Sequence, residues 1–269
     1  MFTDSHCHLS FPELREQLPT ILDAMQLAQV DRALCICTTL EEFDEVHALA
    51  TGHAQLWSTV GVHPDNEGVR EPSLDDLLTR AALPRVVGIG ETGLDYYRLN
   101  GRSVADMAWQ RERYVTHIQA GRQTDLPLVI HTRSASDDTL AILREAGGLG
   151  SGANAGLPTS RGVFHCFTET EAVARAALDL GFYISFSGIL TFRNAADLRE
   201  VARFVPLDRT LIETDSPYLA PVPYRGKTNN PSYVPHVAQQ IAEIKGIPVE
   251  AVARATSANV DQLFTRISA

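Results

Sequence analysis

The chain alternates short hydrophobic runs with longer segments in which hydrophobic residues recur every three or four positions. Short runs bounded by turn residues are typical of strands, and the longer spacing is typical of amphipathic helices. Because the runs are hydrophobic at most positions and helical patterns separate them, they predict a parallel sheet covered by helices. The eight predicted strands lie near Phe2–Ser5, Ala33–Thr38, Leu56–Val62, Val86–Glu91, Leu128–His131, Gly162–His165, Phe182–Ser185 and Thr210–Glu213.

Several helical segments have recognisable ends. Glu169–Leu180 carries a hydrophobic stripe and is followed by Gly181, a typical residue just beyond a helix. Asn194 can cap a second helix. Val234–Ile244 forms a third stripe, and Pro248 suits the first position of a last helix.

Eight strand–helix alternations within 269 residues favour an α/β fold of the closed (β/α)8 TIM-barrel type over an open sheet. We expect a single domain over residues 1–269, since no linker-like segment divides the chain. One segment of biased composition, Gly147–Ser160, is rich in Gly, Ala and Ser and precedes the sixth predicted strand. It predicts a surface loop on the face opposite the carboxyl ends of the strands.

Charge and composition narrow the classes of partner. The formal net charge of -10 argues against broad electrostatic binding to duplex DNA or anionic lipid. It does not exclude a phosphate substrate, because bound divalent cations can reverse the local field. The four cysteines lack the spacing of a disulfide framework, which suits a reducing cytoplasm. Neither a signal peptide nor a transmembrane helix is expected from the pattern.

Candidate metal ligands recur at the carboxyl ends of the predicted strands, where (β/α)8 barrels place their active sites. His6 and His8 lie two positions apart at the end of the first strand, so both face the same side. Imidazoles and carboxylates together suit Zn, Mn or similar divalent ions. The later candidates are His63, Glu91, His131, His165 and Asp215.

The number of candidates indicates two ions rather than one. Four of the histidines and the two carboxylates exceed one tetrahedral set of ligands, whereas two ions bridged by one carboxylate would use them all. Glu91 is the natural bridge because its strand is central in the predicted order. Such a centre can activate water and stabilise the attacking and leaving oxygens.

Six motifs follow one another along the chain: Asp4-Ser5-His6-Cys7-His8-Leu9, Gly61-Val62-His63-Pro64, Gly90-Glu91-Thr92-Gly93-Leu94-Asp95-Tyr96, Leu126-Pro127-Leu128-Val129-Ile130-His131-Thr132-Arg133, Phe164-His165-Cys166-Phe167 and Glu213-Thr214-Asp215-Ser216-Pro217-Tyr218. With Arg225-Gly226-Lys227 and Asn229, they make a chain that resembles the TatD family of metal-dependent deoxyribonucleases, within the amidohydrolase-like barrels. The resemblance spans essentially the whole chain, and its main departure is the Gly/Ala-rich stretch before the sixth strand.

The resemblance implies a role for each candidate. One ion would be held by His6, His8, Glu91 and Asp215, and the other by Glu91, His131 and His165. The implied catalytic residues are Asp215, which would accept a proton from the attacking water, Glu91, and His63, which would lie near the leaving group or the scissile phosphate. Arg133 would hold a phosphate oxygen. The residues expected to line the substrate cleft are Tyr96, Tyr218 and Arg225.

The same resemblance implies two divalent ions, Zn, Mn or Mg, and hydrolysis of phosphodiesters at the ends of single-stranded DNA without sequence preference. A monomer is favoured. An alternative is an amidohydrolase, lactonase or phosphotriesterase acting on a small molecule, since fold does not fix function. Many such enzymes bridge two metals with a carbamylated lysine on the fourth strand, and neither lysine of this chain lies near Glu91. A non-catalytic scaffold is the third possibility, and the complete ligand set argues against it.

Other signals favour ordinary structural roles. Gly88-x-Gly90-x-x-Gly93 matches a dinucleotide-binding fingerprint, but the segment after it does not begin a helix, so the glycines are expected to make room around Glu91. Cys7 and Cys166 are expected to face away from the site if their neighbours face the barrel interior. We expect structural or surface roles for His47, His53, His117 and His236.

Overall fold

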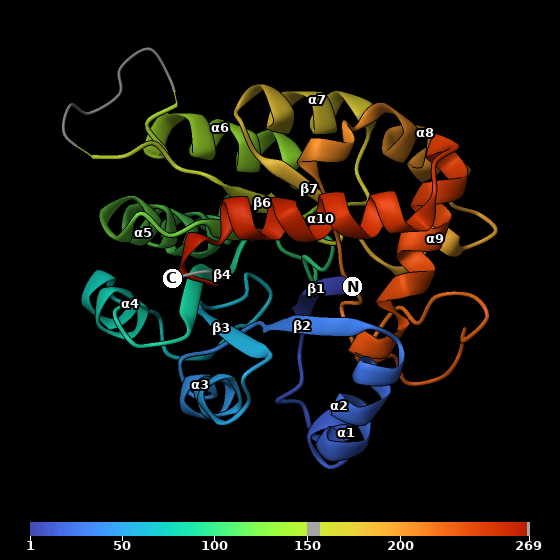
Figure 1. The fold of residues 1–269 in the computed structure, drawn as a ribbon. Coiled ribbons are helices and arrows are strands. Elements are labelled where there is room, and N and C mark those ends of the chain that lie inside the picture. Colours follow the sequence, from blue (N-terminus) through green and yellow to red (C-terminus); the bar gives the residue numbers. More distant parts are fainter. Residues whose placement is uncertain (150–156, 268–269) are drawn as a thin grey trace.

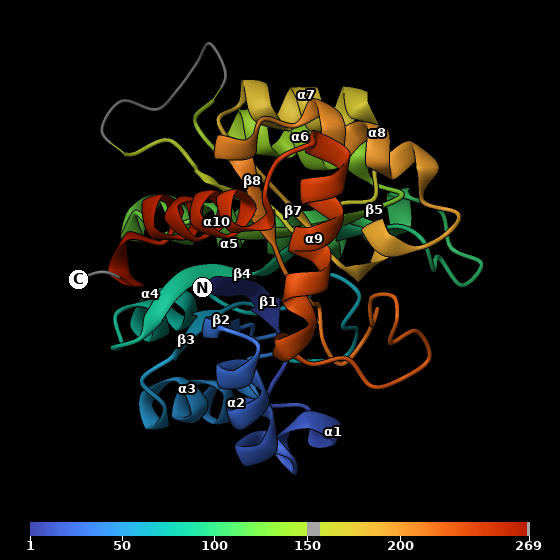
Figure 2. The same ribbon diagram turned by 45° about the vertical axis from the view of Figure 1, so that its right-hand side comes forward.

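The computed structural model describes residues 1–149 and 157–267. Eight parallel strands are arranged in chain order around a nearly closed barrel, which confirms the predicted fold class (Figures 1 and 2). The strands are β1 (Phe2–Cys7), β2 (Val30–Cys35), β3 (Leu56–Val60), β4 (Val86–Asp95), β5 (Leu128–Arg133), β6 (Gly162–Phe164), β7 (Tyr183–Phe186) and β8 (Thr210–Ile212).

The barrel closes just beyond the end of β8. Cys7 of β1 forms a parallel bridge with Ser216. The backbone N–H of Asp215 donates to the carbonyl of His6 (2.9 Å), and that of His8 donates to the carbonyl of Ser216 (2.9 Å). The segment after β8 therefore runs beside β1, and the ends of the first and last strands meet at the barrel mouth.

Helices surround the strands in both ribbon views (Figures 1 and 2). The α-helices are α1 (Pro12–Arg15), α2 (Leu18–Leu27), α3 (Phe43–Gly52), α4 (Leu74–Ala81), α5 (Ala108–Thr124), α6 (Ser136–Ala146), α7 (Glu171–Asp179), α8 (Ala196–Phe204), α9 (Val234–Lys245) and α10 (Val249–Leu263). Short 3-10 turns are η1 (Ala105–Met107), η2 (Gly188–Thr191), η3 (Leu207–Arg209), η4 (Pro231–Tyr233) and η5 (Thr265–Ile267).

Two predicted helix starts need correction. α8 begins at Ala196 with Ala195 in the capping position and no side-chain cap, so Asn194 is not the cap. The reason is a turn before the helix, in which the N–H of Ala195 donates to the carbonyl of Phe192. Pro248 occupies the capping position of α10 rather than its first helical position.

The inside of the barrel is filled by its own hydrophobic cluster, separate from the larger core between the strands and the outer helices. α10 crosses the ribbon in front of the strands in Figure 1 and packs against this cluster, so it covers the amino-terminal end of the barrel. The cluster comprises Leu34, Ile36, Trp57, Val87, Val129, Val163, Tyr183, Leu211, Val260, Leu263 and Phe264. The carboxyl ends of the strands are thus left as the accessible mouth.

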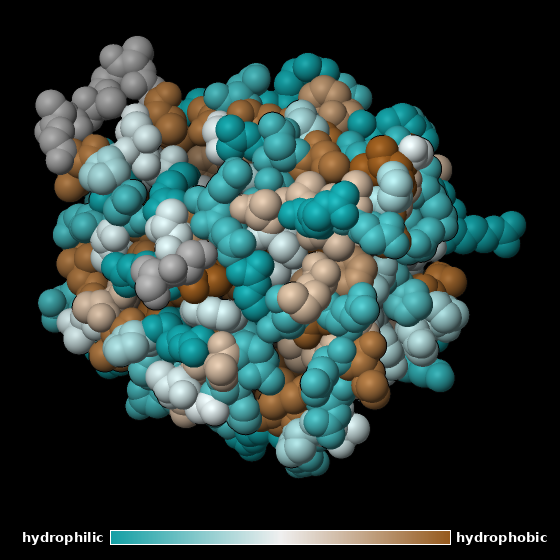
Figure 3. Space-filling model, in the orientation of Figure 1, coloured by the Kyte–Doolittle hydropathy of each residue, from teal (hydrophilic) through white to brown (hydrophobic). Residues whose placement is uncertain are grey.

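The surface over α10 mixes hydrophobic and hydrophilic residues, as Figure 3 shows. Within residues 1–149 and 157–267, none of the helices is both long and apolar enough to cross a membrane. All four cysteines are free thiols. Residues 150–156 of the Gly/Ala/Ser-rich segment lie outside the described residues, so its predicted loop role stays a prediction.

β4 extends furthest beyond its predicted end, because it runs four residues past Glu91 to Asp95. The pairing of β4 with β5 shifts register between Ile89 and Thr92, so Glu91 lies in a β-bulge. A bulge bends the strand and redirects the side chain within it. A hydrophobic pattern cannot show this, because the bulge interrupts the alternation on which strand prediction depends.

Candidate metal centre at the barrel mouth

A cavity of about 690 Å³ opens at the carboxyl ends of the strands. Six of the seven candidate ligands line it, and the seventh, His6, lies fully buried just below them. The sequence therefore predicted which residues converge, although they come from six different strands or the segments after them. The six that line the cavity are His8, His63, Glu91, His131, His165 and Asp215.

Glu91 lies at the middle of the cluster because glycines let neighbouring backbone approach β4. A Cβ added to Gly93, whose φ is +126°, would lie 2.0 Å from the carbonyl oxygen of His131. A Cβ on Gly90 would lie 2.8 Å from the carbonyl oxygen of Val129. Gly90 and Gly93 thus let β4 lie close to β5, and β4 continues to Asp95 where a dinucleotide-binding fingerprint would begin a helix.

The two oxygens of Glu91 face two different groups of histidines. Oε1 lies 2.8 Å from Nε2 of His165, 3.2 Å from Nε2 of His63 and 3.3 Å from Nδ1 of His131. Oε2 lies 3.4 Å from Nε2 of His6 and 3.9 Å from Nε2 of His8. One carboxylate therefore joins two sets of nitrogen donors, which is the arrangement of a bridging ligand.

Asp215 completes the set on the Oε2 side. Its Oδ1 lies 3.4 Å from Nε2 of His8 and 3.6 Å from Nε2 of His6. Asp4, buried between β1 and the end of β8, fixes this pair by accepting hydrogen bonds from the backbone N–H groups of His6 (3.1 Å) and Thr214 (3.0 Å). The positions of His6 and Asp215 are therefore coupled through one carboxylate that the sequence had not singled out.

Three imidazoles have one ring nitrogen held by an outer acceptor. Nδ1 of His8 faces the carbonyl of Ile36 (3.2 Å). Nε2 of His131 faces Oδ2 of Asp95 (3.0 Å), and Nδ1 of His165 faces Oε1 of Glu213 (3.2 Å). An acceptor at one nitrogen places the proton there and leaves the other nitrogen free to bind a metal.

Asp95 and Glu213 contact the outer nitrogens of two candidate ligands, and neither was identified as a candidate from the sequence. Both stand at strand ends, beside candidates that were identified, so the same strand-end rule could have found them. Their partners on the helices and loops could not be read from spacing. Gln110 of α5 exchanges two hydrogen bonds with the backbone of Asp95, and the N–H of Cys166 donates to Glu213 (2.7 Å).

His63 has the opposite hydrogen-bond pattern. Its Nδ1 accepts a hydrogen bond from the backbone N–H of Asp65 (3.0 Å). The neutral ring then carries its proton on Nε2, the nitrogen that faces Oε1 of Glu91. His63 is therefore arranged as a donor at the cavity, although it lies close enough to Glu91 and His131 to be counted among possible metal-binding groups.

Charges and burial shift the pKa values of the central groups. Burial would raise the pKa of Glu91, but the imidazoles of His165 and His63 outweigh it and hold this pKa well below its ordinary value. Burial would lower the pKa of His165, but the carboxylates of Glu91 and Glu213 raise it well above its ordinary value. The buried carboxylates of the centre therefore need compensating positive charge, which protonated imidazoles or a bound cation can supply.

The donor set fits two divalent ions. Nε2 of His165 is buried and lies 2.8 Å from Glu91 but lacks hydrogen-bond geometry, so it has no hydrogen-bond partner among the described residues. His6, His8 and Glu91 each offer one ligand atom within 4.8 Å of the others. Imidazoles with carboxylates suit Zn or Mn, and several buried carboxylates around them would need compensating positive charge.

The remaining predicted site residues divide into two groups. Arg133 lines the cavity with its guanidinium 3.6 Å from the Tyr97 ring centre, and Tyr218 also lines it. Tyr96 and Arg225 do not line it, so their place in a substrate cleft stays a prediction. Tyr96 is buried and donates to Asp138 (2.8 Å), and Arg225 packs on the ring of Phe192.

Cys166 also needs correction, because it lines the cavity instead of facing away. It lies two residues beyond the end of β6 and has a φ of +42°, so the alternation of a strand no longer applies. Cys7 is fully buried and donates to the carbonyl of Leu34. The other predicted structural histidines lie away from the centre, and His117 is fully buried in α5.

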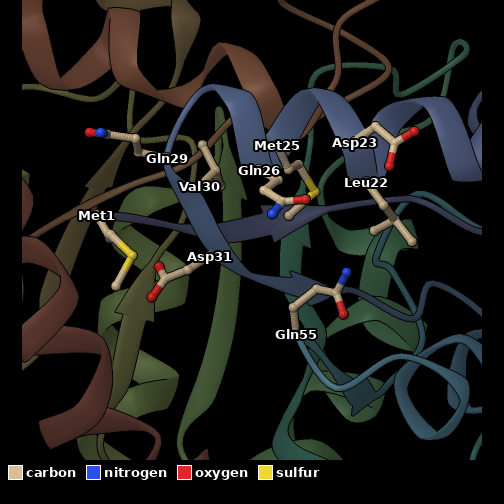
Figure 4. A pocket seen from close by; sticks show the side chains of 9 residues that line it. All are labelled: Met1, Leu22, Asp23, Met25, Gln26, Gln29, Val30, Asp31 and Gln55. Carbon is tan, nitrogen blue, oxygen red and sulfur yellow. The ribbon is translucent and has the colours of Figure 1, made fainter.

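A second, smaller cavity of about 280 Å³ lies at the opposite end of the barrel. Figure 4 shows its lining, which comes from α2, the start of β2 and the residues just before β1 and β3. Two carboxylates and three amides line it, with no histidine or cationic side chain. Of these two cavities, therefore, the one at the barrel mouth holds the histidines and arginines, and the smaller one holds none of them.

Comparisons with known proteins agree with this geometry. Residues 3–265 match the family model described as TatD related DNase. YcfH of Escherichia coli K12, an uncharacterized metal-dependent hydrolase, is 45% identical over 265 residues, which are 97% of this chain and 94% of the relative. The 3'-5' ssDNA/RNA exonuclease TatD of Citrobacter rodentium is 34% identical over 243 residues, 88% of each chain.

The structural comparison points the same way. The crystal structure of YJJV, a TatD homolog from Escherichia coli K12, matches with a TM-score of 0.87 at 27% identity and covers 98% of both chains. The family model, the curated relatives and the fold agree over nearly the whole length. The chain belongs to the TatD-related DNase family of metal-dependent hydrolases.

Proposed function

We propose that this hydrolase cleaves phosphodiester bonds at the ends of single-stranded DNA. The observation that carries the proposal is the position of Glu91, whose two oxygens face separate sets of nitrogen donors at an open barrel mouth. Hydrolysis of a phosphodiester is the reaction to which such two-ion centres are suited. The family description and the exonuclease activity named for one relative support DNA as the substrate class.

The distances around Glu91 support two ligand sets. His6, His8, Glu91 and Asp215 would hold one ion, and Glu91, His131 and His165 the other. When bound, two divalent ions supply Lewis acidity that activates water and stabilises the attacking and leaving oxygens. Asp95 and Glu213 would orient the imidazoles of His131 and His165 through their outer nitrogens.

Two residues would act on the attacking water and on the leaving oxygen. The Asp215 side chain is 16% exposed and faces the cavity, so its carboxylate can accept a proton from an attacking water there. The Nε2–H of His63 would donate a hydrogen bond to the leaving oxygen and stabilise its developing negative charge, because Nδ1 is held by the N–H of Asp65. Arg133, with the neighbouring Arg98, would hold non-bridging phosphate oxygens at the cavity rim.

The test is cleavage of single-stranded oligonucleotides labelled at the 5′ or the 3′ end. The protein is stripped with a chelator and then supplied with Mg, Mn or Zn. We expect laddering from one end only when a metal is restored. A protein that binds two ions but cleaves neither oligonucleotide with any metal would contradict the proposal, and would direct the search to small-molecule esters, lactones and amides.

A further inference from the structure

One side of the cavity at the mouth is apolar and aromatic. Phe11, Ile189, Tyr218 and Leu219 line it, and we call these four residues the apolar wall. They follow β1, β7 and β8, which are neighbours where the barrel closes. The two arginines of the cavity follow or end β4 and β5, on the far side of the strand order.

The aromatic members of the wall make contacts of their own. The Phe11 ring stacks on the imidazole of His8, with ring centres 4.7 Å apart and planes at 15°. The Tyr218 ring meets Phe11 edge to face, with centres 6.3 Å apart and planes at 73°. Tyr218 is 56% exposed, so much of this ring is available to a ligand in the cavity.

Hydrogen bonds and a close backbone contact fix the loop that carries Tyr218 and Leu219. The buried side-chain amide of Asn229 donates to the carbonyls of Thr214 (2.9 Å) and Tyr218 (2.6 Å). A Cβ on Gly188 would lie 2.0 Å from the carbonyl oxygen of Leu219, so the close approach of these segments requires glycine there. A wall fixed in this way loses little conformational entropy when a ligand binds.

Charge alone gives a nucleic acid little affinity for this cavity. Among its lining residues in the described part of the chain, Arg98 and Arg133 are the cations, and four carboxylates accompany them. The formal net charge of the chain is -10. Electrostatic attraction to phosphates grows with the number of contacts to cationic side chains, so two arginines support few contacts. Another source of affinity is needed for a single-stranded substrate.

We propose that the apolar wall is a base-binding subsite, in which the nucleobase beside the scissile phosphate stacks on the exposed ring of Tyr218 and contacts Phe11 beside it. This inference rests on the proposed function, because it assumes a nucleotide whose phosphate lies at the Glu91 centre. Stacking on aromatic rings accepts every base, since each has a flat π face. The subsite therefore provides affinity for single strands without reading their sequence.

The first test measures binding without cleavage. Two oligonucleotides carry 2-aminopurine at the 3′ or the 5′ terminal position, and fluorescence is recorded with excess chelator present. Stacking quenches this base, so we expect quenching of one of the two by the wild-type protein. Tyr218→Ala should weaken binding about tenfold, and Tyr218→Phe should restore it. Val222→Ala, an exposed change in the same loop but outside the cavity lining, should bind like the wild type.

The second test compares cleavage of a normal oligonucleotide with one whose terminal nucleotide is abasic. With metal restored, the wild type should prefer the normal substrate through KM, and Tyr218→Ala should lose most of this preference with little change in kcat. Equal cleavage of both by the wild type, or quenching that Tyr218→Ala leaves unchanged, would overturn the subsite. Tyr218-dependent quenching without any cleavage would instead support the subsite and contradict the proposed hydrolysis.

Discussion

At the scale of single residues, hydrogen bonds to the ring nitrogens separate the histidines of the centre into two kinds. His8, His131 and His165 present a free nitrogen to the cavity, because an acceptor holds the proton on the other one. His63 presents a nitrogen that carries a proton. Sequence spacing predicts that these side chains meet, but it cannot predict their tautomers, because the partners are Ile36, Asp95, Glu213 and the backbone of Asp65.

His63 provides the first prediction. His63→Ala should lower kcat on single-stranded DNA roughly 100- to 1,000-fold, because the leaving alkoxide loses a hydrogen bond that stabilises its negative charge. The loss should be much smaller with a p-nitrophenyl phosphodiester of a nucleotide, whose leaving group departs without a proton. Metal content, measured by elemental analysis, should stay at the wild-type value. A loss of bound metal in this variant would show that His63 is a ligand.

Glu213 provides the second prediction, as a positioning residue that acts through His165. Glu213→Gln keeps the shape of the side chain but removes the charge that faces Nδ1 of His165. Metal affinity should fall about 10- to 100-fold in a competition titration with a chelator, with little change in melting temperature. Glu243→Gln, an exposed change on α9, is the matched control. Equal affinities in the two variants would refute this role.

At the scale of elements, α5 holds the strand ends that carry the centre. Its buried polar residues bond to backbone groups of two neighbouring segments: Gln110 to Asp95, Arg113 to the carbonyls of His63 (2.7 Å) and Asn66 (2.9 Å), and His117 to the N–H of Val62 (3.0 Å). The hydrophobic pattern predicted a structural or surface role for His117, and the structure confirms a structural one.

The link between α5 and the segment after β3 predicts a pH dependence of stability. Burial lowers the pKa of His117 from 6.5 to about 4, because its Nε2 accepts from Val62 and a second proton has no acceptor there. The unfolded chain therefore binds a proton that the folded protein refuses between these two pH values. This contribution to stability is complete above pH 6.5 and is lost as the pH falls toward 4.

The free energy of unfolding should thus drop by roughly 2 kcal/mol between pH 8 and pH 5 from this residue alone. Denaturant titrations of the wild type and of His117→Gln at several pH values isolate it, since the other histidines are common to both. The difference in the free energy of unfolding between the wild type and His117→Gln should shrink or change sign as the pH falls. Parallel pH profiles would contradict the assignment.

The strand bounds show which features of the fold a local sequence pattern can predict. Seven of the eight strands begin within one residue of their predicted starts, because hydrophobic runs bounded by turns are local signals, and the eighth, β2, begins three residues early at Val30. The bulge at Glu91 and the continuation of β4 to Asp95 depend on pairing with β5, which is a contact between distant segments. The close contacts of Gly90 and Gly93 are of the same kind.

At the scale of the whole molecule, the barrel is covered at one end by α10 and open at the other. The alternation of elements predicted this architecture, since a (β/α)8 barrel has only one face at which strand carboxyl ends meet. The division of the mouth into a cationic side and an apolar wall could not be predicted, because it depends on which loops meet at the closure of β1 and β8.

The same architecture predicts that metal stabilises the fold. The ligands come from widely separated parts of the chain, so the unfolded state cannot assemble the site, and ions bind the folded state selectively. At 100 times the dissociation constant, one ion adds about 2.7 kcal/mol, which raises the melting temperature by about 5–10 °C in a protein of this size. Thermal unfolding of chelated protein with and without added Mn measures this shift. An unchanged melting temperature would contradict selective binding.

The most direct measurement of the central claim is a stepwise metal titration in which bound ions and cleavage of an end-labelled single-stranded oligonucleotide are recorded together. The account predicts two ions per chain in the wild type, with cleavage appearing as the second site fills, because Glu91 joins both donor sets. Glu91→Ala should fold, as judged by circular dichroism, yet show no metal-dependent cleavage. Near-normal cleavage by Glu91→Ala, or full activity of the wild type with a single ion, would contradict the bridging role.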